Sequence, residues 1–241
     1  MKDGSLARIG GWSSFAIGAL SIVYAVAYLI VTPAAQRGAD VAAFYASFAA
    51  NPTGRQLASL CFVLTGALGP FVVAAVAERL RPAGEGWSRW ALAVGTLALV
   101  ATGVHGFYSM VALPAQASMY NAGDAATRAA VAAAFGMPAP FDPKELFTFG
   151  FTGLWALAVG LLTLRGADLP RWLGYLAAVA GADMLLLFGA DVAGAGTLIL
   201  LTGGLASLIL GPVLWAGIGL TLLRGAGATA VARPGIRASS A

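Results

Sequence analysis

The chain has 241 residues, of which 10% are charged and 59% are hydrophobic. Soluble domains usually contain about 25% charged residues, and a globule of this size cannot bury so much apolar surface. The composition therefore excludes a cytosolic enzyme, a secreted disulfide scaffold and a disordered chain, and it indicates an integral membrane protein. The net charge of +4 comes with no basic stripe among aromatic residues, so no nucleic-acid partner is expected.

Long apolar stretches predict six membrane-spanning helices. About 20 helical residues cross a hydrocarbon core of about 30 Å, and the backbone of each segment must satisfy its hydrogen bonds internally. The fold class expected is therefore an all-α integral membrane protein, a bundle of six transmembrane helices. The expected spans are residues 12–32, 57–77, 90–113, 146–164, 172–189 and 197–223.

The first span follows Lys2 and Arg8, as the core of a signal peptide would. Its apolar run is longer than the core of about 7–15 residues that signal peptides have, and Pro33-Ala34-Ala35 is a poor cleavage site. We therefore expect this segment to remain in the protein as a helix.

The distribution of Lys and Arg predicts the orientation of the bundle. If the amino terminus lies inside the cell, the outer loops hold only four of the 14 basic residues, namely Arg37, Arg55, Arg128 and Lys144. An excess of basic residues is typical of the cytoplasmic side. Both termini are therefore expected in the cytoplasm.

The expected outer loops, residues 33–56 and 114–145, are long enough to fold over the bundle. Asp124 precedes an Ala-rich stretch and is a suitable helix N-cap, so a short helix is expected over 124–135, ended by the prolines that follow it. This helix is either an ordinary surface element or a lid over an outward-facing pocket.

Two Gly-Pro pairs, at Pro70 and Pro212, lie inside the second and sixth spans. A proline there removes a helical hydrogen bond, so both helices are expected to bend. From residue 225 the chain is rich in Gly, Ala and Ser, which predicts a flexible cytoplasmic tail over 225–241 attached to one membrane domain over 1–224.

Small residues and repeated tryptophans suggest how the helices pack. Small residues recur every four positions at Ser14 and Gly18, and again at Gly203, Ser207 and Gly211. Such faces let helices approach closely. The fourth and sixth spans also end alike, with Leu-Trp at Trp155 and Trp215 and a terminal Arg-Gly. This similarity reflects either duplication of a helical hairpin or the common needs of an interfacial helix end.

Asp183 and His105 are the candidate catalytic residues. At about 1.5 Å per residue, Asp183 lies about 17 Å along the span that begins at Trp172. An ionised carboxylate at such a depth disfavours insertion by at least about 2.5–3.5 kcal/mol, so it normally has a partner or a function. His105 lies about 22 Å along the third span, and the two could form a proton-transferring pair. The alternative is that both are only polar contacts between helices.

Hydroxyl groups accompany these two residues at similar depth in most of the spans. The candidate ligand contacts are Tyr24, Thr65, Thr102, Ser109, Thr148, Thr152 and Trp155. The chain has one Cys and one His, which excludes an internal disulfide, bis-histidine haem and the usual zinc sites. No cofactor and no metal are therefore expected.

Residues 151–160 (FTGLWALAVG) and 164–174 (LRGADLPRWLG) carry a pattern of G-L-W, a short basic turn and L-P-R-x-L-G. Together with Glu78-Arg79-Leu80-Arg81-Pro82 and Leu214-Trp215, this resembles the bacterial membrane family called domain-of-unknown-function family 4386. The resemblance covers the second to sixth spans. It implies a six-helix, multi-pass protein of the bacterial inner membrane with no established activity. A histidine of the family near the start of the fourth span is replaced here by Pro143 and Lys144.

Three functions remain open. The first is a bundle that binds or moves a small amphiphilic molecule in a polar pocket around Asp183 and His105, open outward or to the outer leaflet. The second is a cofactor-independent intramembrane enzyme of the acid–base isomerase or cyclase type that acts on an isoprenoid or lipid-like substrate. The third is a structural or accessory membrane subunit. The expected partners are membrane lipids and, for the first two functions, a lipophilic or amphiphilic ligand.

Overall fold

The computed structural model describes residues 4–37, 40–135 and 142–231 and, within them, forms helices and turns without a strand. Six helices are long and apolar enough to cross a membrane, as the sequence predicts. Their bounds are Ser5–Val31, Thr53–Ala83, Glu85–Ala122, Leu146–Leu164, Arg171–Ala193 and Gly196–Gly225. Many large apolar side chains on these helices stay exposed, among them Ile30, Phe107 and Leu201. Lipid would cover these side chains in a membrane.

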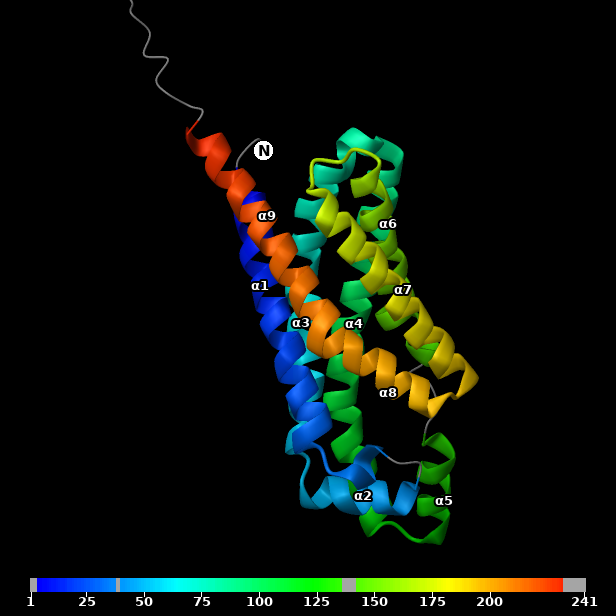
Figure 1. Cartoon of the computed structure of the whole chain (residues 1–241). Coiled ribbons are helices and arrows are strands. Elements are labelled where there is room, and N and C mark those ends of the chain that lie inside the picture. The colour runs from blue at the N-terminus through cyan, green and yellow to red at the C-terminus, as the bar shows by residue number, and fades with distance from the viewer. Residues whose placement is uncertain (1–3, 38–39, 136–141, 232–241) are drawn as a thin grey trace, which may run out of the picture.

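The helices form a closed ring when followed by their contacts. Helix α1 (Ser5–Val26) packs against α3 (Thr53–Leu80) and α9 (Gly211–Val231), and α3 packs against α4 (Glu85–Ala122). The ring continues through α6 (Thr152–Leu164) to α7 (Arg171–Ala193), which contacts α9. Figure 1 shows the amino terminus and the end of α9 at one end of this ring, which we call the terminal end.

Glycines allow the neighbouring helices to come close. A Cβ added at Gly66 of α3 would lie 2.3 Å from Cα of Gly103 in α4, so only glycine fits at this crossing. The predicted seam at Ser14 and Gly18 is confirmed, because Ser14 Oγ donates a hydrogen bond to the carbonyl of Trp215 at 2.6 Å. In the seam predicted at Gly203, Ser207 and Gly211, a Cβ at Gly203 would meet only Leu187 Cδ1, at 3.8 Å, whereas a Cβ at Gly211 would lie 3.7 Å from Ser21 Oγ of α1.

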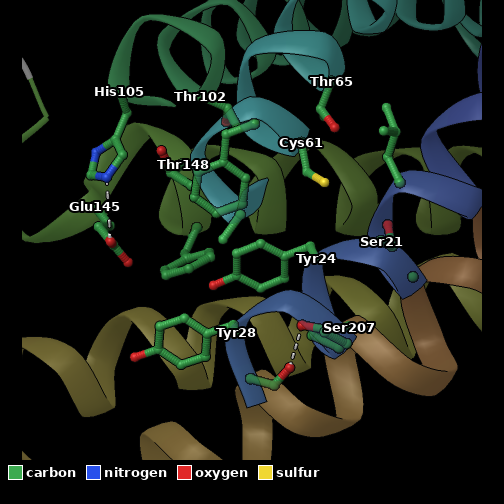
Figure 2. Close-up of a pocket in the computed structure, with 18 of the residues that line it drawn as sticks. Ser21, Tyr24, Tyr28, Cys61, Thr65, Thr102, His105, Glu145, Thr148 and Ser207 are labelled. Carbon is green, nitrogen blue, oxygen red and sulfur yellow. Dashed lines mark hydrogen bonds and ion pairs between the residues drawn. The ribbon is translucent and has the colours of Figure 1, made fainter. Parts of the chain in front are cut away.

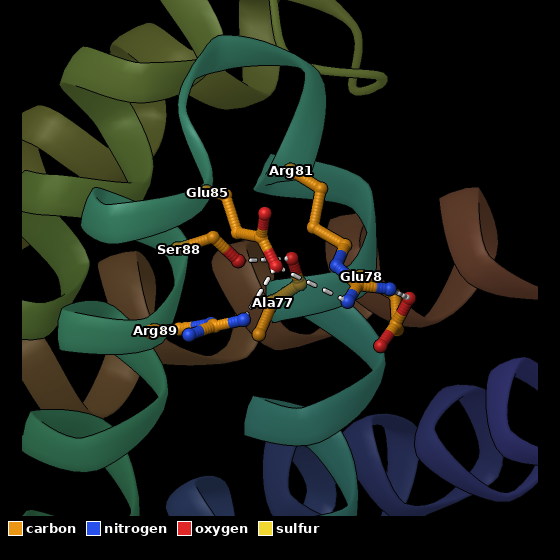
Figure 3. A network of polar contacts seen from close by, with 6 residues as sticks. All are labelled: Ala77, Glu78, Arg81, Glu85, Ser88 and Arg89. Atoms are coloured by element: carbon orange, nitrogen blue, oxygen red, sulfur yellow. Dashed lines mark hydrogen bonds and ion pairs between the residues drawn. The ribbon is translucent and has the colours of Figure 1, made fainter.

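At the terminal end, α3 and α4 are joined by a tight turn, the 3-10 segment η3 (Arg81–Ala83). Figure 3 shows Ser88 donating to the carbonyl of Ala77 at 2.6 Å across this turn. Glu78 pairs with Arg81 at 2.9 Å, and Glu85 pairs with Arg89 at 2.7 Å. The hydrogen bond of Ser88 is buried and ties the two helices together, whereas the two ion pairs are exposed.

Most of the helices extend beyond the predicted spans, and the ends of α4 and α9 differ the most. Helix α4 runs through Pro114 to Ala122, whereas the sequence places its end at residue 113. Residues 114–122 remain helical because they pack their apolar side chains on the neighbouring α2. Helix α9 continues to Val231, so the first part of the expected tail is helical.

The two Gly-Pro pairs have different consequences. Helix α3 continues through Pro70 without interruption. The sixth span instead consists of α8 (Gly196–Leu205), a π-helical segment η6 (Ala206–Leu210) and α9, in which Pro212 is the second residue. A proline ring clashes with the carbonyl of residue i−4 in an α-helix, and the wider π turn accommodates this.

The loops opposite the terminal end fold into a layer that we call the cap. It contains α2 (Val41–Ala50) and α5 (Ala125–Ala134), both visible at the bottom of Figure 1. The expected helix over 124–135 is confirmed, and Asp124 is its N-cap, accepting from the amide of Thr127 at 2.8 Å. The prolines at 138 and 140 lie outside the described residues. The buried core of the cap is Phe44, Tyr45, Phe48, Ala117 and Val131.

Candidate functional site

A pocket of about 280 Å³ lies inside the ring of helices. All six spans contribute to its wall. Its apolar lining includes Ile17, Leu20, Phe62, Leu99, Phe149, Met184, Leu187, Ile199, Leu200 and Trp215. Its polar lining includes Ser21, Tyr24, Tyr28, Arg55, Ser59, Thr65, Thr102, His105, Ser109, Glu145, Thr148, Thr152 and Ser207.

Most of the candidate residues meet at this pocket. Those that line it are Tyr24, Thr65, Thr102, His105, Ser109, Thr148 and Thr152. Trp155 does not line it but stacks on Trp215, which does, with ring centroids 5.7 Å apart. These side chains, which the sequence predicts at a similar depth in their spans, therefore lie around one pocket.

Asp183 is the exception. It is buried on α7, with 7% of its surface exposed, as its depth in the span predicts. It does not line the pocket, however, and its buried Oδ2 makes no hydrogen bond within the described residues. The expected pair of Asp183 with His105 is not formed: α7 borders the pocket through Met184 and Leu187, and Asp183 is not among the lining residues.

Two other carboxylates approach His105. Its Nδ1 lies 3.8 Å from Oδ2 of Asp142, and its Nε2 lies 3.8 Å from Oε1 of Glu145. Figure 2 shows the imidazole and Glu145 facing each other at one side of the pocket. Each ring nitrogen therefore has a carboxylate oxygen nearby at a distance that a small adjustment would turn into a hydrogen bond.

Asp142 is fixed by the start of the fourth span. Its side chain has no exposed surface, and it accepts hydrogen bonds from the amide of Phe147 at 2.7 Å and from Oγ1 of Thr148 at 2.6 Å. It thus satisfies backbone N–H groups that a helix start leaves without partners. The same contacts hold its carboxylate beside His105.

Glu145 reaches the pocket through an unusual backbone. Lys144 and Glu145 have φ values of 53° and 54°, in the left-handed region that residues other than glycine rarely adopt. Such conformations persist where the surroundings enforce them, and they concentrate at functional sites. Here they turn the Glu145 side chain inward, while Lys144 remains exposed.

The surroundings of Glu145 make its ionisation less favourable than in water. Burial, followed by the negative charges of Asp191 and Asp142, raises the pKa of Glu145 to about 7. Arg55 and Lys144 oppose this shift but do not cancel it. The carboxyl group therefore changes charge near neutral pH.

Arg55 lies at the same end of the pocket and is held by the cap. Its guanidinium carbon lies 5.0 Å from the ring centroid of Tyr28 and 5.5 Å from that of Phe44. Its Nη2 donates to the carbonyl of Gln36. This cation thus connects the cap to the pocket wall through rings and backbone.

Three π-helical segments surround the pocket. They are η1 (Ala27–Val31), η5 (Leu146–Phe151) and η6, and each contributes lining residues, such as Tyr28, Thr148 and Ser207. A π turn inside an α-helix is rare and occurs frequently at functional sites. Their coincidence at one pocket singles it out from the rest of the bundle.

One hydroxyl at the pocket is left without a partner. In the third, fourth and sixth spans a threonine donates to the carbonyl four residues earlier, as Thr102 does with Ala98 at 2.9 Å. Thr152 follows the π segment η5, and its buried Oγ1 makes no hydrogen bond within the described residues. The widened turn moves the usual acceptor away. The pocket therefore offers a buried polar atom that a ligand or water can bind.

Sequence reasoning missed Asp142, Glu145 and Arg55. Asp142 could have been found as an N-cap five residues before Phe147, at the start of the fourth span. Glu145 stands beside Lys144 in the sequence, which suggests an exposed ion pair, and its inward turn depends on backbone angles that no local pattern encodes.

Among the described residues, no group of three or more His, Cys, Asp and Glu side chains could hold a metal ion.

Comparison with known proteins gives a family and no function. No curated protein and no solved structure significantly matches the chain. Residues 13–222 match the family described as Domain of unknown function (DUF4386), in agreement with the resemblance of the fourth and fifth spans. Since this match covers most of the sequence, the protein belongs to the DUF4386 family.

Proposed function

We propose that this protein binds a small amphiphilic molecule in the pocket within its membrane-spanning helices. The observation that supports this is the gradient of polarity along the pocket. Arg55, His105 and Glu145 lie toward the cap, whereas Ile17 and Trp215 lie deeper, toward the terminal end. A molecule with a polar end and an apolar body matches both parts of this lining.

The orientation proposed from the basic residues places the cap on the outer side of a bacterial inner membrane, with both termini in the cytoplasm. The polar end of the pocket then lies in the outer half of the bilayer. The pocket wall on the α8 side contains the apolar residues Ile199 and Leu200. An amphiphile that comes from the outer leaflet would meet this apolar part of the wall.

A pocket-filling substitution tests the proposal. Gly203 lines the pocket, and a Cβ there meets nothing closer than 3.8 Å, so Gly203→Leu places a side chain in the cavity without a backbone clash. Gly189→Leu is the matched control, because Gly189 is exposed, does not line the pocket and has no neighbour within 4 Å of its Cβ. Native mass spectrometry of protein released from a mild detergent measures the bound small molecule.

We expect the wild type and Gly189→Leu to retain a bound amphiphile and Gly203→Leu to lose it. Equal retention of the amphiphile by all three proteins would contradict the proposal. So would wild-type protein that carries no bound amphiphile after purification from lipid-containing membranes.

A second function is favoured by the two carboxylates at His105. An imidazole held between Asp142 and Glu145 can accept and return a proton, as acid–base isomerases and cyclases require. To test this, the amphiphile extracted from the wild type is incubated with fresh protein, and products are sought by mass spectrometry. An enzyme forms a product that His105→Gln does not form; an unchanged amphiphile with both proteins contradicts catalysis.

A further inference from the structure

The polar end of the pocket offers a carboxylate and several hydroxyl oxygens as hydrogen-bond acceptors. Tyr24 and Tyr28 direct their hydroxyl groups to the side of the pocket where Glu145 lies, as Figure 2 shows. The carboxylate of Glu145, when ionised, is an acceptor without a donor, and the buried hydroxyl of Thr152 has no hydrogen-bond partner within the described residues. A cationic donor group on a ligand would pair with the ionised carboxylate and could also donate to the hydroxyl oxygens.

The resident cations do not balance the negative charge there. The guanidinium of Arg55, which lines the pocket, is engaged with Tyr28, Phe44 and the carbonyl of Gln36. Lys144 is exposed. Burial is the largest cause of the raised pKa of Glu145, and the negative charges of Asp191 and Asp142 raise it further than Arg55 and Lys144 lower it.

Resting on the proposed function, we propose that the polar end of the ligand is a protonated amine, bound by the carboxylate of Glu145 and the hydroxyl oxygens of Tyr24 and Tyr28. A primary ammonium has three N–H donors and no acceptor. It therefore complements an acceptor-rich site, and a buried charge requires such an oppositely charged partner. The aliphatic chain of the amine lies along the apolar lining from Ile17 to Trp215.

Binding of an ammonium requires Glu145 to be ionised, so protons compete with the amine. The charged and titratable groups that face Glu145 are Tyr24 of α1, Arg55 of α3, His105 of α4, Asp142 and Lys144 of its own segment, and Asp191 of α7. With a pKa of about 7, the ionised fraction of Glu145 rises about tenfold between pH 6 and pH 8.

The test compares three amphiphiles that share a dodecyl chain: dodecylamine, dodecanol and dodecyl sulfate. Their affinities for the full-length protein in a nonionic detergent are measured by equilibrium dialysis at pH 6 and pH 8. We expect dodecylamine to bind at least tenfold more tightly than dodecyl sulfate at pH 8, and about tenfold more tightly at pH 8 than at pH 6.

Glu145→Gln is expected to weaken dodecylamine binding about tenfold, to remove its pH dependence and to leave dodecanol binding unchanged. Tyr28→Phe keeps the ring under Arg55 and removes one acceptor, so a severalfold loss for dodecylamine alone is expected even if Glu145→Gln folds poorly. Preference for dodecyl sulfate, or an unchanged affinity of both variants for dodecylamine, overturns the inference. In that case, binding of dodecanol that Gly203→Leu abolishes still supports the proposed function, whereas the absence of any such binding overturns both.

Discussion

Trp155 of α6 stacks on Trp215 of α9, with ring centroids 5.7 Å apart and ring planes 19° from parallel. These are the two tryptophans that align when the ends of the fourth and sixth spans are compared. The stack joins α6 and α9, which both pack against α7, and Trp215 lines the deep end of the pocket. The two similar span ends therefore each supply one ring of the same contact, whether the similarity arose by duplication or by convergence.

Gly95 makes room for this stack. A Cβ at Gly95 would lie 2.4 Å from Cδ1 of Trp155, whose ring is 1% exposed and cannot move aside. Gly95→Ala is therefore expected to lower the free energy of unfolding by about 1–3 kcal/mol. Gly86→Ala on the same helix is the control, because its Cβ meets nothing within 4 Å. Thermal unfolding in detergent compares the two; equal melting temperatures would show that the ring adapts.

Asp142 is expected to contribute more to stability than the N-cap of the cap helix α5. Asp142→Ala removes acceptors for the amide of Phe147 and the hydroxyl of Thr148 in a buried position, which is expected to lower the free energy of unfolding by about 2 kcal/mol. Asp124→Ala, at an exposed cap, is expected to have a smaller effect. A larger loss with Asp124→Ala in the same unfolding assay contradicts this ranking.

Glu145 is expected to make the unliganded protein less stable as the pH rises. Its folded pKa of about 7 lies above its ordinary value of 4.5, so the folded state binds the proton more tightly. The resulting stability is present below pH 4.5 and is lost as the pH rises to about 7. Because the side chain is 33% exposed, the loss is about 1–3 kcal/mol. The difference in melting temperature between the wild type and Glu145→Gln, measured at pH 5 and pH 8, should reveal it; a difference independent of pH excludes this titration.

Thr152→Val tests the buried hydroxyl at the pocket. Valine has nearly the same shape and removes an oxygen that lacks a protein partner, so the empty protein is expected to gain about 1 kcal/mol of stability. Thr163→Val, on the same helix, removes a hydrogen bond to the carbonyl of Val159 and is expected to lose about 0.5–1.5 kcal/mol. If both variants lose equally, water satisfies Thr152 in the wild type.

Cysteine labelling tests the orientation. In a Cys61→Ser background, Ala46→Cys places a thiol on the exposed face of α2, and Gly86→Cys places one at the terminal end. A membrane-impermeant maleimide is expected to label Ala46→Cys in intact cells and Gly86→Cys only after lysis. The reverse pattern would place the cap in the cytoplasm.

The fold could be predicted largely from the sequence because the length of an apolar run is a local property. The fourth span, residues 146–164, has the predicted bounds. The end of α4 could not be predicted, because residues after Pro114 are held helical by packing on a distant segment, α2. Burial of Asp183 was predictable from its depth, but which side chains of α7 line the pocket depends on how α7 packs.

The site was predicted in part for the same reason. Depth along each span brings Tyr24, His105 and Thr152 to one level, and the structure gathers them. Glu145 and Asp142 come from a segment outside the spans that folds back, so their proximity to His105 depends on the left-handed turn at Lys144.

The three π segments have a geometric consequence for this bundle. A π turn closes its hydrogen bond one residue later than an α turn, so each segment stores one extra residue within its helix. Returning that residue to α geometry rotates everything beyond it by about 100°. In η5 such a rotation would carry Thr148 and Phe149 off the pocket wall and bring other side chains in their place. A change between π and α geometry in η5 would therefore alter which side chains line the cavity, while the helix itself would remain intact.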